Sequence, residues 1–212
     1  YFLDLLGTLA FGLAGFATAV RRRYDLWGAI VLTSLPAVGG GTVRDILVGG
    51  DRVPPFIFAD ATYVYMVMVI VVAGSLWNRL RPGRHSAINT DSNLFLVIDT
   101  VGLAAFSIIG AKVAILAQLD WFWIPFLAAL TCAGGGAMMD FVTAREPRTF
   151  RGILYEELAI LGGLFLLFLL YFAQYADDVE SYIELAIVLT FIFVFGARVV
   201  AVKRGWTTPT LV

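Results

Sequence analysis

The sequence has little charge, one cysteine and one histidine. Charged residues make up 15% of its 212 residues, whereas about 25% is usual for a soluble domain. With Cys132 alone, an intrachain disulfide is excluded, and the redox compartment cannot be inferred. His85 has no cluster of metal-ligating residues around it. The sequence also lacks a phosphate-binding loop and a nucleophile–base motif. We therefore expect no enzyme activity, no metal, no cofactor and no nucleic-acid partner.

Apolar residues, in contrast, are abundant and lie in long runs. Hydrophobic residues account for 60% of the chain, and the mean hydropathy is +0.86. A helix needs about 20 mostly apolar residues to cross a bilayer, whereas strands of a membrane barrel would be alternating segments of about ten. The first run has three arginines after it and no basic residue before it, opposite to a signal peptide. We expect spanning helices at 3–20, 26–46, 58–77, 93–116, 121–143, 152–173 and 182–202.

The basic residues indicate how these seven spans are oriented. Alternating loops place 11 basic residues on one side and two, Arg44 and Arg52, on the other. The positive-inside rule puts the richer side in the cytoplasm. The N-terminus is then outside and the C-terminus inside. Lys112 and Arg198 fall within spans, and Arg198 is expected to snorkel from the cytoplasmic end of the last one.

The chain matches itself at an offset of 95 residues without gaps. Asp4 aligns with Asp99, Asp45 with Asp140, and the first glycine triplet with the second. Each copy holds three predicted helices, so the second copy must enter the membrane from the opposite side. We expect an all-α integral membrane fold of two inverted three-helix repeats plus a seventh helix. The divisions are 1–78 (repeat 1), 79–92 (cytoplasmic linker), 93–173 (repeat 2) and 174–212 (outer loop, last span and tail).

Two glycine triplets are the strongest functional signal. Glycine costs about 1 kcal/mol relative to alanine within a helix, and proline removes a backbone donor. The second and fifth spans should therefore break or kink here, freeing carbonyls that line a polar path. Close helix packing is the alternative, because small residues let backbones approach in membranes. The residues concerned are Pro36, Gly39, Gly40, Gly41, Gly134, Gly135 and Gly136.

Lys112 lies deep in the fourth span, where an ionisable side chain usually faces protein or water. Its height in the membrane is similar to that of the first glycine triplet, given the helical rise of about 1.5 Å per residue. We expect its ammonium to bind carbonyls at the span 2 break and so gate a pore. Snorkelling to the outer surface is the alternative.

Four aspartates follow the repeat symmetry, with Asp4 and Asp45 toward the outer side and Asp99 and Asp140 toward the inner side. They either form negatively charged pore mouths that attract cations or anchor helix ends. An Asp4–Arg44 pair is expected, which would make Arg44 structural.

The motifs Gly39–Asp45 and Gly134–Asp140, in a chain with seven spans, resemble the trimeric intracellular cation (TRIC) channel family, above all its prokaryotic branch. That branch overlaps a family once described as glycine transporters. The resemblance implies a homotrimer in a prokaryotic inner membrane, with lipid and monovalent cations as partners. It also implies one pore per subunit, lined by the second and fifth helices, that passes K⁺ and Na⁺.

Two features depart from the animal members of that family. They carry a Lys-Glu-Val motif on the fourth helix, whereas Val113 directly follows Lys112, and no lysine-rich tail follows Arg204. Regulation by calcium or lipid phosphates is therefore not expected. The second function considered is a secondary transporter of a small amino acid such as glycine, because inverted repeats with broken helices also build transporters.

Overall fold

The computed structural model describes residues 1–80, 93–147, 150 and 154–209, and within them the chain is helical almost throughout. Among these described residues, seven helical segments are long and apolar enough to span a membrane. This confirms the number of spans predicted from the sequence. Of the linker predicted at 79–92, only residues 79 and 80 are described, and they belong to the end of α5. The elements are α1 (Phe2–Arg21), α2 (Leu26–Ser34), η1 (Leu35–Gly39), α3 (Gly40–Val48), η2 (Gly50–Arg52), α4 (Phe56–Ala59), α5 (Thr62–Leu80), α6 (Asn93–Leu116), α7 (Trp123–Val142), α8 (Glu156–Tyr171), η4 (Phe172–Tyr175) and α9 (Val179–Arg204).

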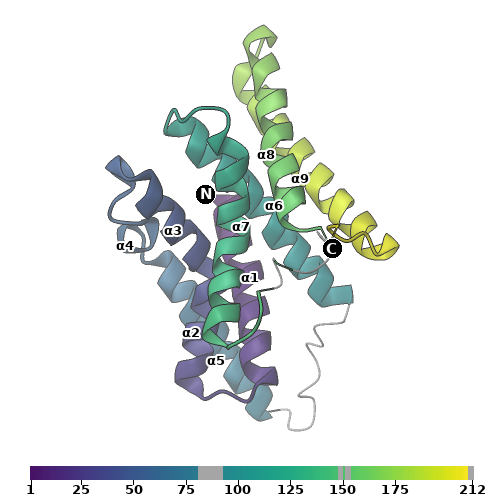
Figure 1. Ribbon diagram of the computed structural model, residues 1–212. Helices are drawn as coiled ribbons and strands as arrows, with labels where there is room; N and C mark the ends of the chain where they lie inside the picture. Colours follow the sequence, from purple (N-terminus) through teal and green to yellow (C-terminus); the bar gives the residue numbers. More distant parts are fainter. Residues whose placement is uncertain (81–92, 148–149, 151–153, 210–212) are drawn as a thin grey trace.

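Helices α1, α6 and α7 form the middle of the molecule, as Figure 1 shows. Helices α2, α3 and α5 lie on one side of them, and α8 and α9 lie on the other. The second span, Leu26–Val48, consists of α2, η1 and α3 joined end to end. The sixth span, Glu156–Tyr175, consists of α8 and η4.

The contacts between α1 and α6 show the inverted repeat directly. A methyl group added at Gly7 would lie 2.6 Å from the ring of Phe106, and one added at Gly102 would lie 2.3 Å from the ring of Phe11. Moving each residue by 95 positions exchanges these two contacts. The two rings also pack edge to face, with centroids 5.1 Å apart. The two helices therefore cross in antiparallel fashion about a pseudo-two-fold axis.

The same symmetry relates the first two helices of each repeat. Gly15 on α1 packs against the backbone of α2, where an added methyl would lie 2.2 Å from the Leu32 carbonyl oxygen. Gly110 on α6 packs against α7, where an added methyl would lie 2.3 Å from the Leu127 carbonyl oxygen. Both positions need glycine because the neighbouring backbone occupies the space of a side chain.

Helix α9 stands outside the symmetry and packs on α6 and α8. Asp178 caps its N-terminus, accepting hydrogen bonds from the Ser181 hydroxyl at 2.6 Å and from the backbone N–H of Glu180 and Ser181. These bonds, the Ser181 hydroxyl first, lower the pKa of Asp178. The cap is therefore complete at neutral pH and weakens only as the pH falls through that lowered pKa.

Candidate functional site

The two glycine triplets face each other, with η1 and α3 of the first repeat against α7 of the second. A methyl at Gly40 would lie 2.3 Å from the Thr131 carbonyl oxygen, and one at Gly135 would lie 2.5 Å from the Leu35 carbonyl oxygen. A methyl at Gly134 would lie 3.3 Å from the Cα of Gly40. The backbones of the two spans are thus in direct contact, and we call this the triglycine contact. It lies on the pseudo-two-fold axis.

Helix geometry at the two triplets differs from the prediction. In the second span, α-helical winding gives way to a π-helical turn, Leu35–Gly39, which begins next to Pro36. Because proline has no N–H, the Leu32 carbonyl cannot receive its usual bond from residue 36. Such turns are frequent at functional sites. The second span is therefore irregular at Pro36, but its winding continues through Gly40 and Gly41 as α-helix, so the structure shows a π turn where a break or kink was predicted.

The break predicted in the fifth span is wrong. Helix α7 continues as a regular α-helix from Trp123 through Gly134, Gly135 and Gly136 to Val142. Gly135, and less tightly Gly134, lies where a neighbouring backbone approaches closely, which was the alternative interpretation of the sequence; Gly136 has no such neighbour among the described residues. The sequence signal did not distinguish the two cases, because a glycine triplet permits both bending and close packing.

The two triplets are not equivalent at their third glycine. A methyl at Gly41 would lie 2.8 Å from the ring of Phe56, which begins the short helix α4. A methyl at its repeat partner, Gly136, would have no neighbour within 4 Å among the residues that the structure describes. One half of the site is therefore covered by the α4 segment, and the symmetry-related half is open. We refer to the covered half as the α4 side.

A buried ion pair holds the α4 segment in place. The Arg44 guanidinium contacts the Asp45 carboxylate at 2.8 and 2.9 Å, through Nη2 and Nε. The other Asp45 oxygen accepts a hydrogen bond from the backbone N–H of Phe56 at 3.0 Å. Only 3% of Arg44 and 1% of Asp45 are exposed. The pair thus joins α3 to the start of α4, and within the protein Arg44 compensates the charge of Asp45.

Aromatic side chains extend this link to α1. The guanidinium carbon of Arg44 lies 5.8 Å from the centre of the Phe56 ring, which packs edge to face on Tyr63 at 4.5 Å. The Tyr63 hydroxyl donates a 2.7 Å hydrogen bond to Asp4. The predicted Asp4–Arg44 ion pair is therefore wrong. Arg44 is ion-paired, but with its neighbour Asp45, and the aromatic pair lies between it and Asp4.

The repeat partners of these carboxylates have different surroundings. Asp140 is 3% exposed and does not have an arginine in its preceding position, where Met139 replaces Arg44. Asp99 lies 3.9 Å from Nη2 of Arg198 on α9. Both side chains face protein, which favours the anchoring interpretation over a ring of charge at a pore mouth.

Arg198 was expected to snorkel toward the membrane surface, but its side chain instead connects α9 to other parts of the protein. It is 9% exposed, and it donates a 2.6 Å hydrogen bond to the Leu154 carbonyl. Its guanidinium carbon lies 4.8 Å from the centre of the Tyr155 ring. The shared position of Asp99 and Arg198 near the same membrane face was the only sequence signal for their pairing.

Lys112 does not make the contact expected of it. The side chain is exposed on α6, one turn before the helix ends at Leu116, whereas the neighbouring Ala111 and Val113 are buried. The groups packed on the first glycine triplet belong to Met138, Thr131, Gly135, Phe56 and Arg44, and the ammonium of Lys112 is not among them. Lys112 therefore lies on a face of α6 that is turned away from the first glycine triplet.

Replacing Lys112 by alanine should therefore leave single-channel conductance and open probability unchanged. No contact in the described part of the chain depends on its charge, and a snorkelling lysine can be removed without unpairing another group. Planar-bilayer recordings of Lys112→Ala beside the unsubstituted protein test this. A clear change in open probability would restore Lys112 as a gating residue.

Fold and site together define a multi-pass membrane protein of two inverted three-helix repeats, packed on each other at paired glycines. The profile of a family described as "Glycine transporter" matches residues 1–79 and 96–171. The chain belongs to this family. Its curated relatives include a UPF0126 membrane protein of Vibrio cholerae, which is 32% identical over 165 residues. The match covers 78% of this chain and 66% of that protein, so this chain spans just under two thirds of that relative's length. The UPF0126 inner membrane protein YadS of Escherichia coli is 32% identical over 77% of this chain and 75% of its own length.

Solved structures with the same fold are TRIC channels. One, from work on conductance through TRIC cation channels, has a TM-score of 0.81 and 22% identity and covers 99% of this chain and 95% of its own. The TRIC orthologue from Rhodobacter sphaeroides has a TM-score of 0.79 and 25% identity, covering 96% and 97%. The resemblance to the TRIC family is thereby confirmed, and both the family and its structural neighbours are described as transport proteins, not enzymes.

Proposed function

We propose that this protein is a passive channel for monovalent cations, K⁺ and also Na⁺. The observation that carries the proposal is the likeness of nearly the whole chain, 99% of it, to a structure of a TRIC cation channel. The described site is compatible with it. An inverted repeat brings two spans into contact at glycines, and carbonyls of the π turn, those of Leu35 and Pro36, face α7 in that contact, where separation of the two spans would expose them to a cation.

The proposed pore runs within one subunit, between the second and fifth spans. In the described conformation the triglycine contact closes that route, because the backbones of α3 and α7 touch there. Conduction then requires these two helices to separate. The α4 side is the more tightly closed half in this proposal. Phe56 covers Gly41 there, whereas the surroundings of Gly136 on the other half are open.

The assembly and placement are proposed from the relatives and the charge pattern. The Rhodobacter sphaeroides neighbour is described as trimeric, which supports a homotrimer with one pore per subunit. An inner-membrane location follows the description of the Escherichia coli relative. The positive-inside rule places the α4 side outside and the C-terminus in the cytoplasm.

A secondary transporter of glycine or a similar small amino acid is the second candidate. The description of the matching family favours it, and inverted repeats with an irregular helix are found in transporters. A transporter would alternate between closure of its two halves, and the difference between Gly41 and Gly136 is compatible with that cycle.

Flux into liposomes separates the two functions. With purified protein in potassium-loaded liposomes, a channel predicts rapid dissipation of the potassium gradient, reported by a potential-sensitive dye, without added glycine. Labelled glycine should not accumulate above protein-free liposomes. Saturable glycine uptake coupled to an ion gradient, with no independent potassium leak, would contradict the channel and favour the transporter.

A further inference from the structure

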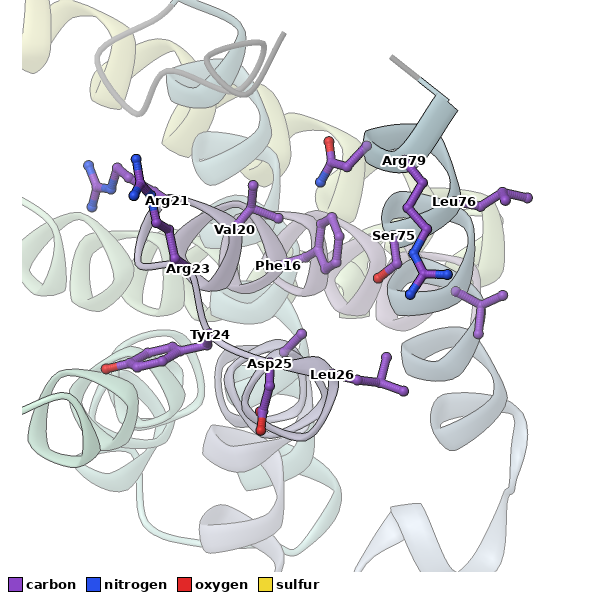
Figure 2. A pocket seen from close by; sticks show the side chains of 13 residues that line it. Phe16, Val20, Arg21, Arg23, Tyr24, Asp25, Leu26, Ser75, Leu76 and Arg79 are labelled. Atoms are coloured by element: carbon purple, nitrogen blue, oxygen red, sulfur yellow. The ribbon is translucent and has the colours of Figure 1, made fainter. Parts of the chain in front are cut away.

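A cavity of about 880 Å³ lies away from the triglycine contact, at the end of the molecule opposite α4. Its walls come from the end of α1, the α1–α2 turn with the start of α2, and the end of α5 (Figure 2). All three are ends of membrane spans, so the cavity lies at the level where a bilayer meets water. Neither the proposed cation path nor its gating uses it.

The lining has an apolar part, with basic side chains on either side of it. Three arginines line the cavity against one carboxylate, Asp25, and Figure 2 shows Arg21 and Arg23 at the end of α1 on the opposite side from Arg79 of α5. Asp25 is engaged as the N-cap of α2, accepting a 2.8 Å hydrogen bond from the Gly28 N–H. The apolar part is formed by Phe16, Val20, Leu26, Ala29, Val72 and Leu76.

The arginines near this cavity differ in what they already bind. Arg22 donates a 3.2 Å hydrogen bond to the Thr143 carbonyl and ties the α1–α2 turn to the end of α7. Arg22 does not line the cavity. Arg23 and Arg79 line it and are exposed, and their guanidinium groups have no hydrogen bond or ion pair with any residue that the structure describes. Figure 2 shows Arg79 extending from α5 toward the gap between α5 and the start of α2.

We propose that this cavity binds the headgroup of an anionic phospholipid, with an acyl chain along its apolar wall. Guanidinium groups pair with phosphate oxygens in bidentate fashion, and basic pockets between membrane helices on the cytoplasmic side suit anionic headgroups. The apolar wall distinguishes a lipid from a soluble anion, because it buries hydrocarbon that inorganic phosphate does not carry. The richer basic side of the chain is also the side that the charge pattern places in the cytoplasm.

The lipid would hold the α1–α2 turn to the end of α5. Helix α2 continues through the π turn into α3, so whatever fixes its start also fixes one partner of the triglycine contact. The cavity is thus separate from the permeation path but connected to it through α2. An effect of the bound lipid on conduction departs from the expectation, drawn above from the sequence, that lipid phosphates do not regulate this chain.

Native mass spectrometry of the detergent-purified protein with added phosphatidylglycerol tests the proposal. We expect one tightly retained phosphatidylglycerol per chain and much weaker retention of phosphatidylcholine. The double variant Arg23→Gln/Arg79→Gln should bind phosphatidylglycerol roughly tenfold more weakly, because each basic side chain near a bilayer contributes to anionic-lipid affinity. Ser75→Trp, which fills the cavity and keeps every charge, should also lose the retained lipid.

The matched control is Lys203→Gln/Arg204→Gln, which removes two exposed charges from the same predicted side and should keep its lipid. An unchanged thermal midpoint of all variants in lipid-free detergent shows that they are folded. Equal retention of both lipids, or equal losses in the two double variants, would overturn the proposal. Displacement of the lipid by millimolar inorganic phosphate would overturn it in favour of a soluble anion. A subunit contact that covers Arg79 in the assembled protein would overturn it in favour of a second copy of the chain.

Discussion

Replacing Arg44 by methionine should lower the thermal unfolding midpoint of the detergent-purified protein by about 10 °C. The substitution keeps most of the side-chain length but leaves the Asp45 carboxylate 1% exposed without its cation. Removing one partner of a buried ion pair costs about 3–5 kcal/mol, because the remaining charge is uncompensated. The same change should loosen α4, since Asp45 also accepts the Phe56 N–H.

The double variant Arg44→Met/Asp45→Asn provides the control. Asparagine removes the orphaned charge and keeps an oxygen that can accept the Phe56 N–H, so much of the lost stability should return. Thermal unfolding followed by size-exclusion chromatography measures both variants. If Arg44→Met is as stable as the unsubstituted protein, or the double variant is less stable than the single one, the pair is not the structural link described above.

The second large effect is expected at the triglycine contact. In Gly135→Ala, the new methyl would lie 2.5 Å from the Leu35 carbonyl oxygen and 2.9 Å from the Cα of Pro36. Both are backbone atoms, so the two spans must move apart. Overpacking of this kind costs about 1–3 kcal/mol, a loss of about 5 °C or more in the unfolding midpoint. Channel activity should change as well, because the proposed closed state depends on this contact.

Gly136→Ala is the matched control, one residue further along the same α-helix. Its methyl would have no neighbour within 4 Å in the described part of the chain, and alanine is a better helix former than glycine by about 1 kcal/mol. We expect unchanged or raised stability and near-normal currents. Two variants that behave alike, in stability and in open probability, would contradict the assignment of Gly135 to the contact.

The fold could be predicted from the sequence because two independent signals, the long apolar runs and the internal repeat, each extend over most of the chain. The apolar runs predicted all seven spans, and the offset of 95 residues predicted contacts that the structure shows in symmetric pairs, such as Gly7 with Phe106 and Gly102 with Phe11. Because each repeat has an odd number of spans, the opposite orientation of the two repeats can be predicted without knowing how the helices pack. The orientation in the membrane stays a prediction.

The site was predicted less completely, because its details depend on which face of a helix each residue occupies. Height along the membrane placed Lys112 near the first glycine triplet, but the rotation of α6 leaves it exposed. Arg44 was expected to reach across to Asp4, yet Asp45 is adjacent and its carboxylate is better placed. The basic cavity could not be predicted at all, since it depends on α5 closing against the α1–α2 turn.

Reversal potential in a planar bilayer, with potassium chloride more concentrated on one side, tests the central claim most directly. A passive cation channel predicts unitary currents that reverse close to the Nernst potential of potassium, and replacing part of the potassium by sodium should keep the currents. Currents that reverse at the chloride potential or at zero would contradict cation selectivity. Folded, reconstituted protein that gives no unitary currents would contradict the channel itself.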